Sequence, residues 1–172
     1  FMHDSFGYHF RNKLGPLFES AVFLPMFSHP IPDAARSFVT GSDQIVFEVA
    51  ERNALRELVG TGTAGHLAAA LADDYTQTPV SFARDGLDVV FDVPVGNPGE
   101  LRYLIAEMSV ADVVMIGDIY EIDIDPTEGA WPNEVTPEAS RYGFEIMELS
   151  GPMVIPIEPS VTVTDAFMIT IE

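Results

Sequence analysis

This chain has no cysteine and almost no lysine. Lys13 is the only lysine, and arginines supply the rest of a basic set of eight in 172 residues, against 27 Asp and Glu. Binding to nucleic-acid phosphates needs clustered Lys and Arg, so these few dispersed cations disfavour direct contact with DNA or RNA. Without cysteine there is no disulfide, no thiol nucleophile and no Cys-based zinc site.

Long hydrophobic runs are also missing. The longest apolar stretches, 21–27 and 110–117, fall well short of the roughly 20 residues that a membrane-spanning helix needs. The first residues lack the basic region and apolar core of a signal peptide. We therefore expect a soluble chain with no transmembrane segment. Hydrophobic residues make up 47% of it, too many for a disordered acidic tail, and the length predicts one domain.

The formal net charge of −19 is the strongest compositional signal. A charge this far from zero keeps a protein soluble but destabilises its compact state by self-repulsion, unless salt screens the surface. The excess of carboxylates therefore predicts adaptation to a salty medium. The alternative is an acidic protein that binds cations or mimics nucleic acid.

Residues 1–43 read as an irregular N-terminal arm that is rich in aromatic residues and proline. Proline is tolerated at a first helical position, so the segment 16–24 is the only helix expected there, and the prolines after it predict no regular structure. An apolar arm must be buried on its own domain or on a neighbouring subunit. The candidate interface residues are Phe1, Phe6, Tyr8, Phe10, Phe18, Phe23, Phe27 and, from a Pro-rich loop, Trp131, which could instead fix its own loop.

Residues 44–172 read as a β-sandwich with a helical insertion at 50–74. Helices are expected at 50–59 and 63–73, on either side of a glycine-rich segment. Asp85-Gly86 between alternating apolar runs predicts a hairpin. The segment 100–108 fits a returning strand or a helix, 113–125 a long strand, and 125–140 a loop.

The C-terminal run has the clearest two-residue period in the chain. Its apolar residues share one parity, which predicts that they share one face of a sheet: Ile155, Ile157, Val161, Val163, Phe167, Ile169 and Ile171. Pro159 and Asp165 interrupt the pattern, so a turn or bulge is expected at either place. About eight strands with two or three short helices predict a mainly β, antiparallel, jelly-roll-like sandwich.

One motif suggests a nucleotide site. Gly60, Gly62 and Gly65 have the spacing of a dinucleotide-binding loop before a helix, where such glycines let backbone N–H groups approach a pyrophosphate. Arg52, Arg56 and Glu57 precede the loop at helical spacing, however, whereas a dinucleotide fold needs a buried strand there. A connector between helices is therefore the favoured interpretation, and a nucleotide-binding enzyme is kept as an alternative.

Acidic residues are densest between Asp118 and Glu134. Glu121, Asp123 and Asp125 alternate, so on a strand they share one face with about 7 Å between neighbours. Oxygen ligands of this kind suit calcium or magnesium, which makes a cation-dependent binding module a second alternative. The spacing lacks the glycine-hinged loop of an EF-hand, and a solvated acidic face explains it equally well.

No other pattern points to catalysis. The four histidines are scattered, and no serine lies in a Gly-x-Ser-x-Gly elbow. We therefore expect a structural protein without a cofactor. In size, acidity and strand pattern, residues 44–172 resemble the single jelly-roll capsid proteins of icosahedral viruses that infect halophiles. The resemblance implies a subunit of a virion shell whose partners are copies of itself and related coat proteins.

We predict that salt stabilises the fold. Raising NaCl from about 0.1 M to about 1 M shortens the screening length from about 10 Å to about 3 Å, which weakens repulsion among the carboxylates. The midpoint of denaturation should therefore rise across this range. A midpoint that is flat or falls would contradict adaptation to high salt.

Overall fold

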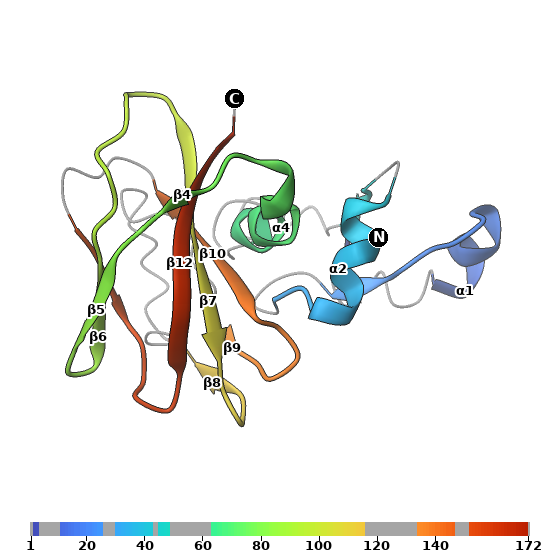
Figure 1. The fold of residues 1–172 in the computed structure, drawn as a ribbon. Coiled ribbons are helices and arrows are strands. Elements are labelled where there is room, and N and C mark those ends of the chain that lie inside the picture. Colours follow the sequence, from blue (N-terminus) through green and yellow to red (C-terminus); the bar gives the residue numbers. More distant parts are fainter. Residues whose placement is uncertain are drawn as a thin grey trace.

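The computed structural model describes residues 2–3, 11–25, 30–42, 45–48, 63–115, 134–146 and 152–171. The fold is mainly β with antiparallel sheets, which confirms the predicted class (Figure 1).

The larger sheet has the order β10-β7-β12-β4 and the smaller has β11-β6-β5. The strands of the larger sheet are β10 (Arg141–Ile146), β7 (Leu101–Ser109), β12 (Thr162–Ile171) and β4 (Thr78–Pro79). Those of the smaller sheet are β11 (Met153–Pro156), β6 (Asp88–Phe91) and β5 (Phe82–Asp85).

The two sheets enclose the main core, as expected for a sandwich. Buried side chains from both sheets belong to one cluster, in which Phe91 and Ile155 of the smaller sheet join Leu104, Phe144 and Ala166 of the larger one. Each strand contributes alternate residues, as the pleat of a sheet requires. The finer assignment to a jelly roll stays a prediction.

Glycine determines two of the turns, the first of which was expected from sequence. The Asp85-Gly86 signal gives the hairpin between β5 and β6, in which Asp85 pairs with Asp88 and Gly86 takes φ +64°. Asn97 to Glu100 forms the next turn, closed by a 3.2 Å hydrogen bond from the Glu100 N–H to the Asn97 carbonyl, with φ +85° at Gly99. The segment after it is strand β7, so the helix that was considered for 100–108 is wrong.

One helix covers the outer face of the larger sheet. The predicted helix at 63–73 is confirmed as α4 (Thr63–Leu71), which continues into a 3₁₀ turn, η4 (Ala72–Asp74). Ala68 and Ala69 of α4 pack against Tyr103 of β7 and against Phe167 of β12. The larger sheet is therefore buried on both faces, by the smaller sheet on one side and by α4 on the other.

A bulge in β12 corrects the prediction of a single apolar face. The pairing of β12 with β7 shifts between Val163 and Asp165, one of the two places where an interruption was expected. Val163 packs against the core between the sheets, but Phe167 lies in the cluster under α4. One extra residue reverses the faces of all residues that follow it. The odd-numbered apolar residues therefore lie on one face of the sheet before the bulge and on the opposite face after it.

The expectations for the arm were partly wrong. In place of a helix at 16–24, the chain forms α1 (Arg11–Leu14) and a 3₁₀ turn, η2 (Gly15–Leu17), which ends where Phe18 turns extended. A second helix, α2 (Asp33–Thr40), follows the last proline of the arm. Pro32 lies just before this helix, where a missing N–H and a φ near −60° cost nothing, so proline starts it rather than preventing it.

Helix α2 packs on the domain. Ile31, Ala35 and Val39 contact Ala70 of α4 in a third apolar cluster. The remaining strands contain two residues each: β1 (Met2–His3), β2 (Leu24–Pro25) and β3 (Phe47–Glu48) pair in parallel, and β8 (Val114–Met115) pairs with β9 (Glu134–Val135). The short β9 lies inside the segment predicted to be loop. The helix predicted at 50–59 and the strand predicted beyond 115 lie outside the described residues.

Candidate functional site

Few of the predicted site residues fall within the described part of the chain. Gly65, Phe18 and Phe23 do. The others lie outside it: Gly60 and Gly62 of the glycine motif, Glu121, Asp123 and Asp125 of the acidic cluster, and Phe1, Phe6, Tyr8, Phe10, Phe27 and Trp131 of the proposed interface.

Gly65 lies where the backbone of α4 touches the backbone of β10. A Cβ atom on Gly65 would be 2.1 Å from the carbonyl oxygen of Gly143, and a Cβ on Gly143 would be 2.0 Å from the carbonyl oxygen of Gly65. Real Cβ atoms do not come this close to an oxygen, so both positions need glycine. The contact explains Gly65 by packing of the helix on the sheet, without reference to a nucleotide.

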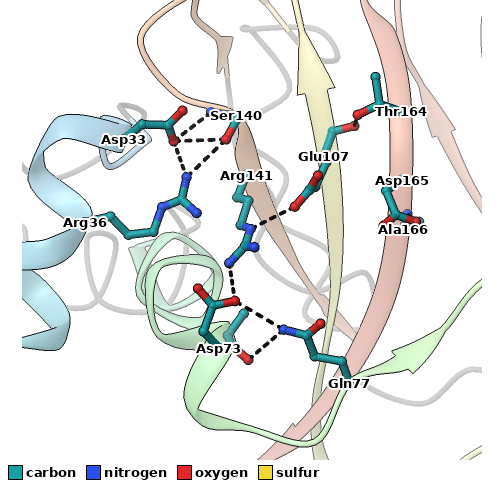
Figure 2. A network of polar contacts seen from close by, with 11 residues as sticks. Asp33, Arg36, Asp73, Gln77, Glu107, Ser140, Arg141, Thr164, Asp165 and Ala166 are labelled. Atoms are coloured by element: carbon teal, nitrogen blue, oxygen red, sulfur yellow. Dashed lines mark hydrogen bonds and ion pairs between the residues drawn. The ribbon is translucent and has the colours of Figure 1, made fainter.

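A polar cluster that sequence reasoning missed holds α2 to the domain (Figure 2). We call Asp33, Arg36 and Ser140 the arm anchor. Asp33 Oδ1 accepts hydrogen bonds from the Ser140 backbone N–H at 3.2 Å and from its hydroxyl at 3.0 Å, and it also pairs with Arg36. Arg36 donates to the Ser140 hydroxyl at 3.1 Å, and the Asp33 N–H donates to the Glu138 carbonyl at 2.9 Å.

A second cluster, next to the arm anchor in Figure 2, joins η4 to the larger sheet. Arg141 of β10 donates to Asp73 at 2.8 Å and to Glu107 of β7 at 3.0 Å, and its guanidinium lies 5.7 Å from the centre of the Phe167 ring. Gln77 donates to Asp73 at 3.3 Å. Arg141 is 34 residues from Glu107 and 68 from Asp73, so no local pattern could have revealed these two contacts.

The ionisation of these carboxylates follows from their partners. Burial raises the pKa of Asp33, but hydrogen bonds from Arg36 and Ser140 and the charge of Arg36 outweigh it, so the pKa lies below its usual 3.8. The hydrogen bond from Arg141 lowers the pKa of Asp73 in the same way. Both groups are charged at neutral pH, and the clusters hold fixed ion pairs rather than an acid or base suited to catalysis.

A cavity of about 400 Å³ lies beneath the arm, between residues 18–24 and α2. Its wall combines apolar side chains, among them Val22, Val39 and Leu67, with Glu19 and three serines. Large apolar groups are exposed nearby: Leu17 is 73% exposed, Phe18 40% and Phe38 51%. The predicted interface residue Phe18 is therefore partly open to solvent, whereas Phe23 is half-buried.

No protein-family model, curated protein or solved structure matches the chain. Within the described residues, no three His, Asp or Glu side chains are grouped closely enough to hold a metal ion. Among the helices of those residues, none has the length and apolar character needed to cross a membrane.

We predict that Gly65→Ala destabilises the protein. Alanine is usually favoured over glycine inside a helix by about 1 kcal/mol. Here its methyl group would push α4 away from Gly143, and overpacking of this kind costs about 1–3 kcal/mol. Urea denaturation should show the loss, and a variant as stable as the wild type would contradict the contact between the two backbones.

We also predict that the arm anchor contributes stability that is lost in acid. A carboxyl with a lowered folded-state pKa stabilises the fold above its unfolded pKa, near 3.8 for Asp33, and this contribution disappears as pH falls through the lower folded value. Asp33→Ala removes these hydrogen bonds and the ion pair and should reduce the unfolding free energy at pH 7. We expect a loss of only about 1 kcal/mol, because the Asp33 side chain is partly exposed and its charge is screened by solvent.

Asp112→Ala, which removes an exposed carboxylate between β7 and β8, is the matched control. The difference between wild type and Asp33→Ala should shrink between pH 5 and pH 2, as measured by urea denaturation at each pH. A difference that stays constant over this range would show that Asp33 does not act through its charge.

Proposed function

We propose that the chain is a structural subunit that assembles with copies of itself, as in a capsid-type virion shell adapted to high salt. A β-sandwich supplies a rigid body, and the arm supplies apolar surface for contact. The observation that carries the proposal is the exposure of large apolar side chains on the arm, next to a cavity in the same surface.

The arm divides at Pro30 into two parts. From Pro30 onward, α2 is held to the domain by the arm anchor and by Ile31, Ala35 and Val39. Before it, α1 and η2 lie to one side of the sheets (Figure 1). Leu17 in this part is 73% exposed. A contact that buried such a side chain would contribute about 1.5–3 kcal/mol.

The acidic surface fits the same function. Copies of a chain with a net charge of −19 repel one another at low ionic strength, so stable assembly requires either salt or contact surfaces with few carboxylates. Leu17, Phe18 and Phe38 provide such a surface, in which Glu19 is the neighbouring carboxylate.

We predict that Leu17→Gln combined with Phe18→Gln weakens assembly. In molar salt the wild type should sediment as an oligomer, and the double variant as a smaller species, because the apolar contact is lost. Val95→Gln is the matched control, since Val95 is 71% exposed and belongs to the loop after β6. Sedimentation velocity measures the size and circular dichroism checks the fold. A wild type that is monomeric at all concentrations in molar salt would refute the proposed function.

A further inference from the structure

In the part of the chain that the structure describes, strand β5 forms one edge of the smaller sheet. In the order β11-β6-β5, its hydrogen-bonded neighbour within the described residues is β6, and all four of its residues are exposed. Before β5 the chain runs along the larger sheet, where the Val80 N–H donates to the Ala166 carbonyl at 2.9 Å. The chain therefore crosses from the larger sheet to the smaller one (Figure 1), and among the described strands none lies on the outer side of β5.

The register of the hairpin shows which backbone groups point outward. The Asp92 N–H donates to the Ser81 carbonyl at 2.9 Å, and Asp85 pairs with Asp88 across the two-residue turn. Hydrogen-bonded pairs alternate along an antiparallel ladder, so residues 81, 83 and 85 bond to β6. The N–H and C=O groups of Phe82 and Arg84 consequently face away from β6, toward the free edge.

This edge lacks the usual protection against pairing with another strand. Natural edges are blocked by lysine, proline, a bulge or a covering segment. Residues 80–85 contain no lysine or proline, and the pairing of β5 with β6 is in continuous register. The one cation, Arg84, turns inward and donates to the carbonyls of Ile157 at 2.6 Å and Val161 at 2.8 Å. An inward-pointing charge can itself protect an edge, but these two bonds pair the guanidinium within its own chain and do not use the outward N–H and C=O groups of residues 82 and 84.

The strand is self-complementary in one antiparallel register. The outward backbone N–H and C=O groups of residues 82 and 84 must lie opposite outward groups of the second copy. Phe82 can therefore pair with Arg84 of the second copy, and Ala83 then lies opposite Ala83 on the two-fold axis. Each guanidinium then lies beside an aromatic ring, a favourable arrangement. Two other registers set outward groups opposite each other. One centres on Phe82 and places Arg84 opposite Val80, whose N–H already donates to the Ala166 carbonyl. The other centres on Arg84 and sets two like charges opposite one another, which is destabilising.

The outer face of the sheet supports the same register. Ala83, Val90 and Val154 lie side by side across β5, β6 and β11, and Val154 is 47% exposed. Pairing about Ala83 would join two such rows into one apolar stripe across six strands. On the inner face, a cavity of about 240 Å³ between β5 and the start of β12, lined by Phe82, Arg84, Val89, Val161 and Val163, would receive the partner's Phe82 ring.

We propose that two copies of the chain pair through antiparallel β5 strands about a two-fold axis at Ala83, forming a continuous six-stranded sheet. As a step in assembly, this pairing rests on the proposed function, that the chain associates with copies of itself. It uses a surface different from the arm, so each contact can be tested without the other.

The absence of cysteine allows a direct test by cross-linking. Opposite residues in a non-hydrogen-bonded pair have Cα atoms about 4.5 Å apart, within the range for a disulfide. Ala83→Cys, mildly oxidised in molar salt, should form covalent dimers about tenfold faster than Val154→Cys, because pairing raises the effective concentration of its sulfur atoms. Val154→Cys lies on the same face but in β11, at the opposite edge of the smaller sheet, and is the matched control.

Asp85→Cys tests the register. In the proposed pairing, its two copies lie more than about 13 Å apart, so it should cross-link no faster than Val154→Cys. Equal rates for Ala83→Cys and Val154→Cys would overturn the pairing, and fast cross-linking of Asp85→Cys would overturn the register.

The two proposals fail in different ways. If Ala83→Cys cross-links as expected but the wild type forms nothing larger than a dimer in molar salt, the edge pairing stands and the shell function fails. If the Leu17 and Phe18 substitutions reduce a large assembly but Ala83→Cys does not cross-link, the shell function stands and the edge pairing is wrong.

Discussion

The burial of the larger sheet on both faces is the constraint on which the rest of the fold depends. Every residue of β7 from Arg102 to Ala106 is buried, so this strand needs cover on two sides. The smaller sheet covers one side, and α4 must come close enough to cover the other. Gly65 and Gly143 permit that approach by bringing helix and strand backbones together. Helix α2 then packs on α4 through buried apolar side chains, and this contact joins the arm to the domain.

Local signals in the sequence predicted most of the individual elements. The hairpin at Gly86, the helix from Thr63 and the interruption near Asp165 depend on turn chemistry and periodicity, which act over a few residues. The faces of β12 were assigned wrongly because alternate residues share one face of a sheet only along an uninterrupted strand, and a bulge exchanges the two faces. Helix α2 was missed because prolines were read as breakers, although Pro32 sits where a helix accepts one.

The candidate site was much less predictable. The arm anchor joins Asp33 to Ser140, 107 residues away, and Arg141 bonds to Asp73, 68 residues away, and to Glu107, 34 residues away. Such pairs arise only when the chain is folded, and no periodicity marks them. Gly65 was noticed in the sequence, but as part of a loop motif. Its role became clear only from the opposite glycine, Gly143, which lies in a strand distant in sequence.

The arginines are used inside the molecule. Each arginine side chain that the structure describes bonds to another part of the fold: Arg36 to Asp33 and Ser140, Arg84 to two carbonyls of the 157–161 turn, Arg102 to the Pro94 carbonyl and Arg141 to Asp73 and Glu107. Arg102 is only 3% exposed, and Gly96 leaves the space that its guanidinium occupies. These guanidinium groups are thereby bonded within the chain, although Arg84 is exposed.

This division of charge determines how copies of the chain could recognise each other. When molar salt reduces the screening length to about 3 Å, long-range attraction between charged surfaces is weak, so specificity must come from contacts at atomic distance. Backbone hydrogen bonds along a strand edge and apolar side chains in cavities are such contacts. Both persist at high ionic strength, and apolar burial is strengthened by kosmotropic salts. An acidic chain that assembles in salt therefore needs edges and apolar side chains more than it needs ion pairs, and β5 and the arm provide these two features.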